Sequence, residues 1–343
     1  MREYLKALSE IDGVSGREER VADFIAERAK PYAASIERDV LKNLFILKKG
    51  ARTPERPIVF AASMDEWGFV ADEAKDSGAI NLSYVDGMDP KAVIGKRFRV
   101  AGGEARGIIS VVSQHLTGKS GTDKVPELRD LTLDVGAKNK DGGKAVVKPG
   151  DGIVYDYPFT EFGEGFYRGK AVDARLGCAI LLRLIEEADP AYDIQFIFTA
   201  SSRIEHRGAE VAARRIDPGI VIVAAAAAAG DVPPQKKVER SCAVGKGVVL
   251  GLKEYGTIYS RELRTHIEAL AAKNGIATQT RSGMRGESDA GQLHHYASGA
   301  KVAGIGAPVR YVGTGNPIVH KDDVEAAYRL AKVCAEEELR WQG

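Results

Sequence analysis

Side chains that could bind a metal ion or transfer a proton stand next to one another at three places in the chain, which are Asp65–Glu66, Glu205–His206 and His294–His295. A further candidate, Asp173, stands without such a neighbour. Carboxylates and imidazoles serve as metal ligands and as general bases. Adjacent residues on a helix, however, point about 100° apart, so neither Glu205–His206 nor His294–His295 is expected to chelate one ion. No three such residues have a zinc spacing such as HExxH.

The other polar candidates have simpler interpretations. Ser201 and Ser202 could suggest a serine nucleophile, but the GxSxG elbow that exposes such a serine is missing, so we do not expect a serine hydrolase. We interpret Glu205 as a residue of the first helical turn and His206 as exposed. His320 is predicted at a helix N-terminus, and His115 lies in a β-rich segment.

The composition excludes several classes of protein. The 343 residues are 44% hydrophobic, which is enough for one large domain or two, and the 49 basic and 48 acidic residues nearly cancel. We therefore expect no nucleic-acid partner, and no apolar run is long enough for a membrane span. The cysteines are odd in number and far apart, which favours reduced thiols in a cytoplasmic protein. They are Cys178, Cys242 and Cys334.

Helical and strand patterns alternate in both outer parts of the chain. Helices are predicted around Leu5 and at 18–30, 176–187, 205–216, 260–274 and 321–340, and strands at 43–47, 57–61, 194–199, 220–224, 248–252 and 302–305. Between about 71 and 160 the helical period disappears, and short alternating strands are predicted at 96–100, 107–112 and 152–155. A β-rich module without helices is therefore expected to interrupt one α/β domain.

Several strings, in order along nearly the whole chain, resemble the glutamyl-aminopeptidase family that builds tetrahedral (TET) particles. The strings are Gly13–Gly16, Met64–Phe69, Asp134–Gly136, Lys148–Asp151, Gly169–Cys178, Arg207–Ala209, Ala229–Asp231, Ser288–Gly291 and Arg310–Tyr311. The resemblance implies a doubly wound mixed sheet flanked by helices, with an inserted small β-barrel-like domain used for dimerisation. The implied division is an α/β domain of residues 1–70 and 165–343 and an inserted domain of residues 71–164.

In that family two divalent ions, such as zinc or cobalt, are held by five ligands beside one general base. Carried over position by position, the ligands fall on Ser63, Asp173, Arg203, Ala225 and Gly313. The base falls on Ser202. Only Asp173 keeps a ligand type, because an arginine has no acceptor and carries a positive charge. The cleft residues that the resemblance retains are Asp65, Glu66 and Arg175.

The replacements predict a catalytically inactive family member, a pseudoenzyme without a metal cofactor. We expect Arg203 to form an ion pair with Asp173, with a nitrogen–oxygen distance of roughly 2.7–3.2 Å and a lowered Asp173 pKa. The alternative is an active peptidase or other hydrolase with a rebuilt site that uses Asp65, Asp173, Glu205 and His206.

The expected partners follow from the same resemblance. The old cleft is expected to bind a peptide or a small metabolite, and the chain is expected to form a homo-oligomer or to join an active homologue. Apolar residues of the β-rich module, such as Phe98, Val100, Ile108 and Ile109, are the candidates for a dimer contact.

Overall fold

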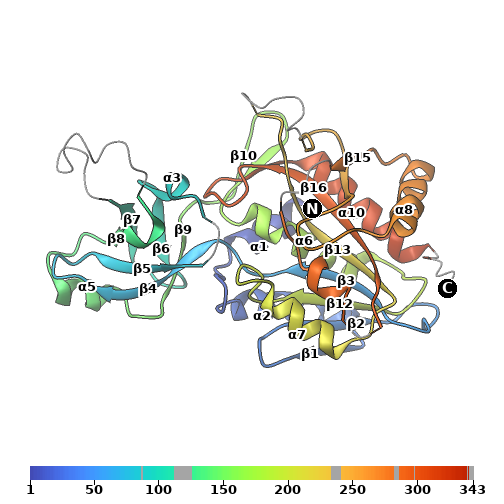
Figure 1. Ribbon diagram of the computed structural model, residues 1–343, viewed down its shortest axis with the longest axis horizontal. Helices are drawn as coiled ribbons and strands as arrows, with labels where there is room; N and C mark the ends of the chain where they lie inside the picture. Colours follow the sequence, from blue (N-terminus) through green and yellow to red (C-terminus); the bar gives the residue numbers. More distant parts are fainter. Residues whose placement is uncertain are drawn as a thin grey trace.

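The computed structural model describes residues 1–85, 88–111, 126–232, 241–281, 286–296, 298–337 and 339. These residues form an α/β body around a large mixed sheet, together with a smaller closed β-barrel. Figure 1 shows the barrel at one end of the long axis and the sheet with its helices at the other. The predicted fold class is thereby confirmed. His115 lies outside the described residues.

The large sheet has eleven strands, and its central strands are parallel. The strands are β1 (Ser35–Arg38), β2 (Leu44–Lys48), β3 (Ile58–Ser63), β10 (Thr160–Phe162), β11 (Phe166–Arg168), β12 (Ile194–Thr199), β13 (Ile220–Ala228), β14 (Val248–Gly251), β15 (Thr278–Arg281), β16 (Lys301–Arg310) and β17 (Ile318–His320). The main path runs β1-β2-β12-β3-β13-β16-β17-β11-β10, and β14 joins β15 to β16. Strands β12, β3, β13 and β16 are parallel neighbours, so their C-terminal ends lie at one edge.

Helices cover both faces of this sheet. They are α1 (Arg2–Glu10), α2 (Glu19–Ala29), the 3-10 turn η1 (Lys30–Tyr32), α6 (Val172–Glu187), α7 (Arg207–Arg215), α8 (Arg261–Lys273), α9 (Ala290–Leu293) and α10 (Lys321–Glu336). On β3, Phe60 belongs to the core under α1, α2, α6, α8 and α10, whereas Val59 and Ala61 belong to the core under α7 and α9. The alternation follows from the two-residue period of a strand.

The alanine run extends β13 and lets a helix approach closely. Residues 220–228 pair with β16 throughout, so the strand continues past its predicted end at 224. On the facing helix α6, a Cβ added at Gly177 would lie 2.0 Å from the Ala224 carbonyl oxygen. Glycine at this position therefore permits the contact between α6 and β13 beside the strand ends.

The barrel has six strands in the closed order β4-β5-β8-β7-β6-β9. They are β4 (Gly68–Ala74), β5 (Ile80–Tyr84), β6 (Arg97–Val100), β7 (Arg106–Ser110), β8 (Thr132–Asp134) and β9 (Gly152–Tyr155). Strand β10 pairs with β11 in the large sheet, although the predicted inserted domain extends to residue 164. The division into domains at 71 and 164 stays a prediction.

The expectation that the module contains no helix is wrong. It holds the short helices α3 (Pro90–Val93) and α5 (Lys140–Val146) and the 3-10 turn η3 (Leu128–Asp130). Asn139 caps α5 by accepting the Gly142 N–H at 2.9 Å. Helices of one or two turns are too short to give a visible hydrophobic period, so only their caps could have predicted them.

Most apolar residues proposed for a dimer contact belong to the barrel core. Phe98, Val100 and Ile109 are buried inside the barrel, whereas Ile108 is 49% exposed. Alternation along a strand sends neighbours to opposite faces, and three of the four residues point inward. No helix in the described ranges is long and apolar enough to cross a membrane, and the cysteines at 178, 242 and 334 are free and buried.

Candidate functional site

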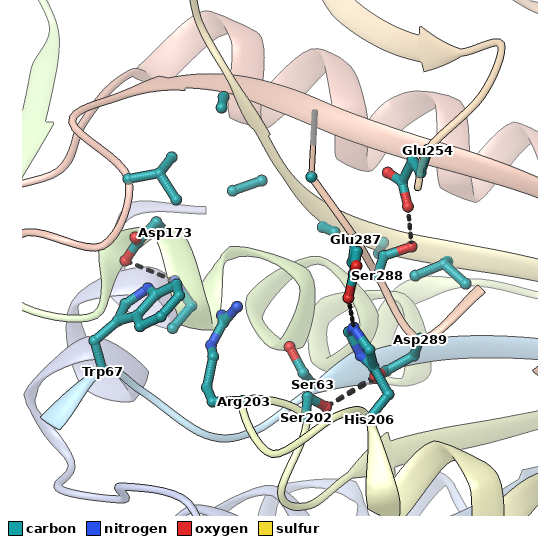
Figure 2. Close-up of a pocket in the computed structure, with 18 of the residues that line it drawn as sticks. Ser63, Trp67, Asp173, Ser202, Arg203, His206, Glu254, Glu287, Ser288 and Asp289 are labelled. Carbon is teal, nitrogen blue, oxygen red and sulfur yellow. Dashed lines mark hydrogen bonds and ion pairs between the residues drawn. The ribbon is translucent and has the colours of Figure 1, made fainter. Parts of the chain in front are cut away.

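A cavity of about 230 Å³ lies at the C-terminal edge of the central parallel strands. In α/β sheets this edge is the usual place for a ligand. Of the predicted site residues, five line it: Ser63, Asp173, Ser202, Arg203 and Ala225. Figure 2 shows Arg203 between Trp67 and the two serines, with His206 and acidic side chains on the opposite side.

Asp173 lies in the first turn of α6 and is 5% exposed. Its Oδ1 accepts the Ala174 N–H at 2.9 Å, and its Oδ2 accepts the Gly313 N–H at 2.8 Å. Gly313 has φ +80°, a conformation that favours glycine. Gly313, which follows the cavity-lining Val312, thus holds Asp173 through its N–H.

The predicted ion pair between Asp173 and Arg203 is wrong. No hydrogen bond or ion pair joins these two described residues; instead, the Arg203 guanidinium carbon lies 4.5 Å from the centre of the Trp67 ring. The predicted lowering of the Asp173 pKa is wrong as well. Burial raises the pKa of Asp173 and outweighs the Gly313 N–H and the Arg203 charge, which both lower it.

Asp65, Glu66 and Arg175 lie behind the cavity and do not line it. Asp65 accepts the Ser15 hydroxyl at 2.5 Å and the Arg203 backbone N–H at 2.7 Å, which fixes the start of the turn after β12. Glu66 and Arg175 are 1% and 0% exposed and belong to a buried ion network. In that network Lys170 lies 2.8 Å from Glu66 Oε1 and 3.1 Å from Asp12.

A second polar cluster centres on Asp289, which precedes α9. Its carboxylate accepts the Ser202 hydroxyl at 2.9 Å and contacts His206 Nδ1 at 2.8 Å, and it also accepts the Thr199 hydroxyl. Burial alone would lower the pKa of His206, but the hydrogen bond to Asp289 raises it. The Asp289 pKa is lowered, because His206 and the hydroxyls outweigh the opposing effect of burial.

The Asp289 cluster corrects our interpretation of His206. The imidazole is only 14% exposed, and its Nε2 lies 3.5 Å from Glu287. Glu205, by contrast, is 75% exposed and pairs with Arg207, so it is not part of the cavity. Sequence reasoning did not include Asp289, although the Ser288–Gly291 string contains it. The presence of an acidic residue, Asp289, in a string that resembles a peptidase family could have marked it as a candidate site residue.

The turn that carries Ser202 and Arg203 is strained. Ser201, Glu205 and His206 have φ values of 52°, 52° and 55°, a region that side chains other than glycine rarely occupy. Such strain clusters at functional sites. Glu18 supports the turn from behind, because its Oε1 accepts the backbone N–H groups of Ser201 at 2.7 Å and Gly16 at 2.9 Å.

Glu18 titrates near neutral pH. Burial and then the nearby charge of Asp65 raise the pKa of Glu18 to about 7.

The far side of the cavity contains Glu254, which accepts the Ser288 hydroxyl at 2.7 Å and lies 3.4 Å from Arg281. Arg203, by contrast, lines the cavity and forms no ion pair with any acidic residue in the described ranges.

Three further histidines make local contacts. His294 and His295 each use Nδ1 to contact a carbonyl four residues earlier, at 2.6 Å and 2.5 Å. His320 is the N-cap of α10, as predicted, and accepts the Asp322 N–H at 3.3 Å. We did not expect His294 and His295 to chelate one ion together, and the Nδ1 atom of each is already in contact with a backbone carbonyl.

Comparisons with known proteins place this geometry in context. Residues 42–330 match the family model described as M42 glutamyl aminopeptidase. A putative aminopeptidase of Acetivibrio thermocellus is 31% identical over 96% of this chain and 97% of its own length. The glutamyl aminopeptidase of Lactococcus lactis is 27% identical over 93% of this chain and 91% of its own.

Solved structures agree in fold along almost the whole chain. A TET aminopeptidase from a marine sediment archaeon of the Thaumarchaeota has a TM-score of 0.93 at 28% identity, covering 98% of this chain and 96% of its own. The TET1 peptidase of Pyrococcus horikoshii, which can assemble into a tetrahedron or a large octahedral shell, has a TM-score of 0.86 at 27% identity, covering 98% and 99%.

These matches overturn the expectation that the chain has no metal cofactor, because M42 aminopeptidases are dimetal enzymes. The side chains at this cleft nevertheless do not fit a pair of metal ions. In the described ranges no group of three or more His, Cys, Asp or Glu residues could hold a metal ion. We therefore derive no chemical step through a metal at this cleft.

Proposed function

Because the chain belongs to the M42 glutamyl aminopeptidase family, we propose that it is a member whose cleft binds a small ligand without cleaving peptides by the family's two-metal chemistry. The observation that carries this proposal is the set of side chains that line the cavity. At the positions that the resemblance assigns to the metal ligands stand an arginine, uncharged residues and one carboxylate, Asp173. At the position that it assigns to the general base, the Ser202 hydroxyl donates a hydrogen bond to Asp289.

The chemistry of these groups supports a binding role. A general base must accept a proton at neutral pH, which a serine hydroxyl does not do unaided. A guanidinium repels a divalent cation and remains charged at any accessible pH. The cavity volume of about 230 Å³ is below the roughly 300–1,000 Å³ of pockets for drug-sized ligands, so a small metabolite is the favoured occupant.

Peptidase assays with added metal test this proposal. Hydrolysis of aminoacyl p-nitroanilides is measured with zinc, cobalt or manganese, and the metal content of each preparation is determined. We expect the unmodified protein to show the same background as its Asp173→Ala variant. Metal-dependent turnover that Asp173→Ala abolishes would contradict the proposal.

One contact favours a second candidate, a hydrolase that uses His206. Asp65 and Glu205 do not line the cavity, which argues against a rebuilt site with Asp65, Asp173, Glu205 and His206. Of these four residues, His206 is the one with an activating partner, because Asp289 contacts its Nδ1 atom. Its Nε2 atom faces Glu287. This candidate requires turnover that persists in EDTA and is lost in His206→Gln. Absence of such turnover rejects it.

We also propose that the chain forms a homo-oligomer, at least a dimer. Assembly of the Pyrococcus horikoshii relative supports it, as do large apolar side chains that the barrel exposes, including Tyr84 at 53% and Ile108 at 49%. Light scattering at micromolar concentration should give a mass of at least twice 36.9 kDa. A single species of 36.9 kDa would reject the proposal.

A further inference from the structure

Opposite charges face the same cavity without touching. Asp173 and Arg203 both line it, and within the described chain no contact within ion-pair distance joins them. The Arg203 guanidinium lies over the Trp67 ring, while the Asp173 carboxylate is held by the N–H groups of Ala174 and Gly313. Backbone and ring contacts thus hold the two charges apart.

Two buried donors at this place have no acceptor. Arg203 Nε and Trp67 Nε1 are shielded from solvent and make no hydrogen bond to any described residue. Because solvent does not reach these two atoms, a ligand in the cavity would meet the terminal guanidinium nitrogens of Arg203 instead, which donate to no described residue. The planar guanidinium suits a carboxylate, which it can bind through two parallel N–H groups.

The Asp173 carboxylate, conversely, can bind a cationic donor. Each of its oxygens accepts one backbone N–H and keeps a second lone pair for another donor. Asp173 is 5% exposed, so a cation bound to its carboxylate would compensate a largely desolvated charge. A simple anion on Arg203 would be repelled by Asp173, and a simple cation on Asp173 would be repelled by Arg203.

A molecule that carries both charges on adjacent groups satisfies both residues. An α-amino acid has its carboxylate and its ammonium on one carbon atom. The wall of the cavity contains the small apolar residues Val223 and Ala224–Ala226, against which a side chain could pack. At the far end Glu254 pairs with Arg281, and His206 lies between Asp289 and Glu287. The cations at that end thus already have acidic partners, which leaves Arg203 as the cation available to a carboxylate.

We propose that this cleft binds a free zwitterionic α-amino acid, with its carboxylate on Arg203 and its ammonium on Asp173. This inference rests on the proposed binding function and narrows its ligand. It separates a free amino acid from the N-terminus of a peptide, because a peptide bond removes the carboxylate charge that Arg203 would recognise.

Binding is tested with the full-length protein and the twenty L-α-amino acids. A thermal-shift screen identifies the amino acid that stabilises most, and calorimetry then measures its Kd. Two matched analogues follow: its amide, which lacks the carboxylate charge, and its desamino acid, which lacks the ammonium. For L-leucine these are L-leucinamide and 4-methylpentanoate. We expect each analogue to bind at least about tenfold more weakly, since each loses a charge-assisted contact.

Variants assign the two contacts. Arg203→Gln and Asp173→Asn should each weaken binding of the amino acid at least about tenfold. Arg203→Gln should leave the Kd of the amide nearly unchanged, and Asp173→Asn that of the desamino acid. Arg214→Gln is the control, because Arg214 pairs with Glu210 on α7 and does not line the cavity. Circular dichroism confirms that each variant is folded.

The outcomes separate this inference from the proposed function. If none of the twenty amino acids binds, or if Arg203→Gln binds them as tightly as the unmodified protein, the inference is overturned while the absence of peptidase activity is unaffected. If metal-dependent hydrolysis is found, the proposed function fails, and the dependence of amino-acid binding on Arg203 still decides the inference.

Discussion

At the scale of single residues, Arg203 has an unusual environment for a cavity-lining cation. Its guanidinium is in contact with the Trp67 ring at 4.5 Å, and its Nε lacks an acceptor among the described residues. Its charge influences Asp173 across the cavity without forming a pair. The two opposite charges therefore influence each other without direct contact.

This geometry predicts a small effect of Arg203→Ala on stability. A cation–π contact contributes about 0.5–1 kcal/mol at a partly exposed site, whereas breaking a buried ion pair costs about 3–5 kcal/mol. We expect Arg203→Ala to lower the free energy of unfolding in urea by about 1 kcal/mol. Arg310→Ala is the comparison, because Arg310 bonds Asp231 at 2.9 and 2.6 Å. An equal loss in both variants would contradict the assignment.

At the scale of elements, the turn after β12 depends on a carboxylate from the start of α2. Glu18 is the N-cap residue of α2, and its Oε1 holds Ser201 and Gly16 through their N–H groups. Asp65 holds the next part of the turn through the Arg203 N–H. Two buried acids thus fix one strained turn, and they repel each other when both are ionised.

Glu18 predicts a pH dependence of stability. Its pKa is about 7 in the folded protein, against 4.5 for an ordinary glutamate side chain, so the folded state favours the protonated form. The resulting stabilisation is full below pH 4.5 and is lost as the pH rises through about 7, by an amount of the order of 3 kcal/mol.

Urea unfolding at pH 5 and pH 8.5 measures this loss. Glu18→Gln is the matched variant, because an amide oxygen can accept both N–H groups but does not titrate. We expect the pH dependence to be smaller in Glu18→Gln, with a remainder from groups such as His206 and Asp173, whose pKa values are also raised. Identical pH profiles in the two proteins would exclude Glu18 as the source.

The contact between α6 and β13 gives a second prediction at this scale. A methyl group at Gly177 would collide with the Ala224 carbonyl, which cannot move without breaking the sheet. We expect Gly177→Ala to destabilise the fold by about 3 kcal/mol or more. Gly142→Ala in α5 is the control, since its nearest neighbours are 3.4 Å away, and it should raise stability by roughly 0.5–1 kcal/mol. Equal effects in thermal unfolding would refute the steric argument.

At the scale of the whole molecule, one hydrogen bond links the barrel to the cavity. Tyr155 lies in the aromatic core of the barrel, with its ring centroid 4.3 Å from that of Phe98. Its hydroxyl donates to the Gly313 carbonyl at 3.3 Å, and the Gly313 N–H donates to Asp173. The barrel therefore helps to position the loop that holds the cavity carboxylate.

Tyr155→Phe should separate this link from barrel packing. The variant keeps the aromatic ring and loses one hydrogen bond, so we expect a stability loss of about 1 kcal/mol. Binding of the amino acid should weaken a fewfold, because Asp173 is held less firmly. Tyr157→Phe is the control, since the Tyr157 hydroxyl makes no hydrogen bond to a described residue. Unchanged affinity in Tyr155→Phe would show that the barrel does not influence the site.

Much of the fold could be predicted from local patterns. Strand β12 has the bounds expected from its apolar run, and β13 and β16 begin within one residue of prediction. Their ends were predicted too early, because alanine, glycine and proline carry little strand signal and only pairing with a neighbouring strand extends them. The short helices α3 and α5 were not predicted, because they are too short to show a hydrophobic period.

The sequence by itself determined the family and which residue types occupy the cleft, because both depend on order along the chain. Only the tertiary structure decided which of them meet. It placed Trp67 under Arg203 and kept Asp173 apart, and it brought Asp289 to His206 across 83 positions. Hydrogen bonding and desolvation depend on distances between elements, and side-chain directions at strand ends are set by packing that no local pattern contains.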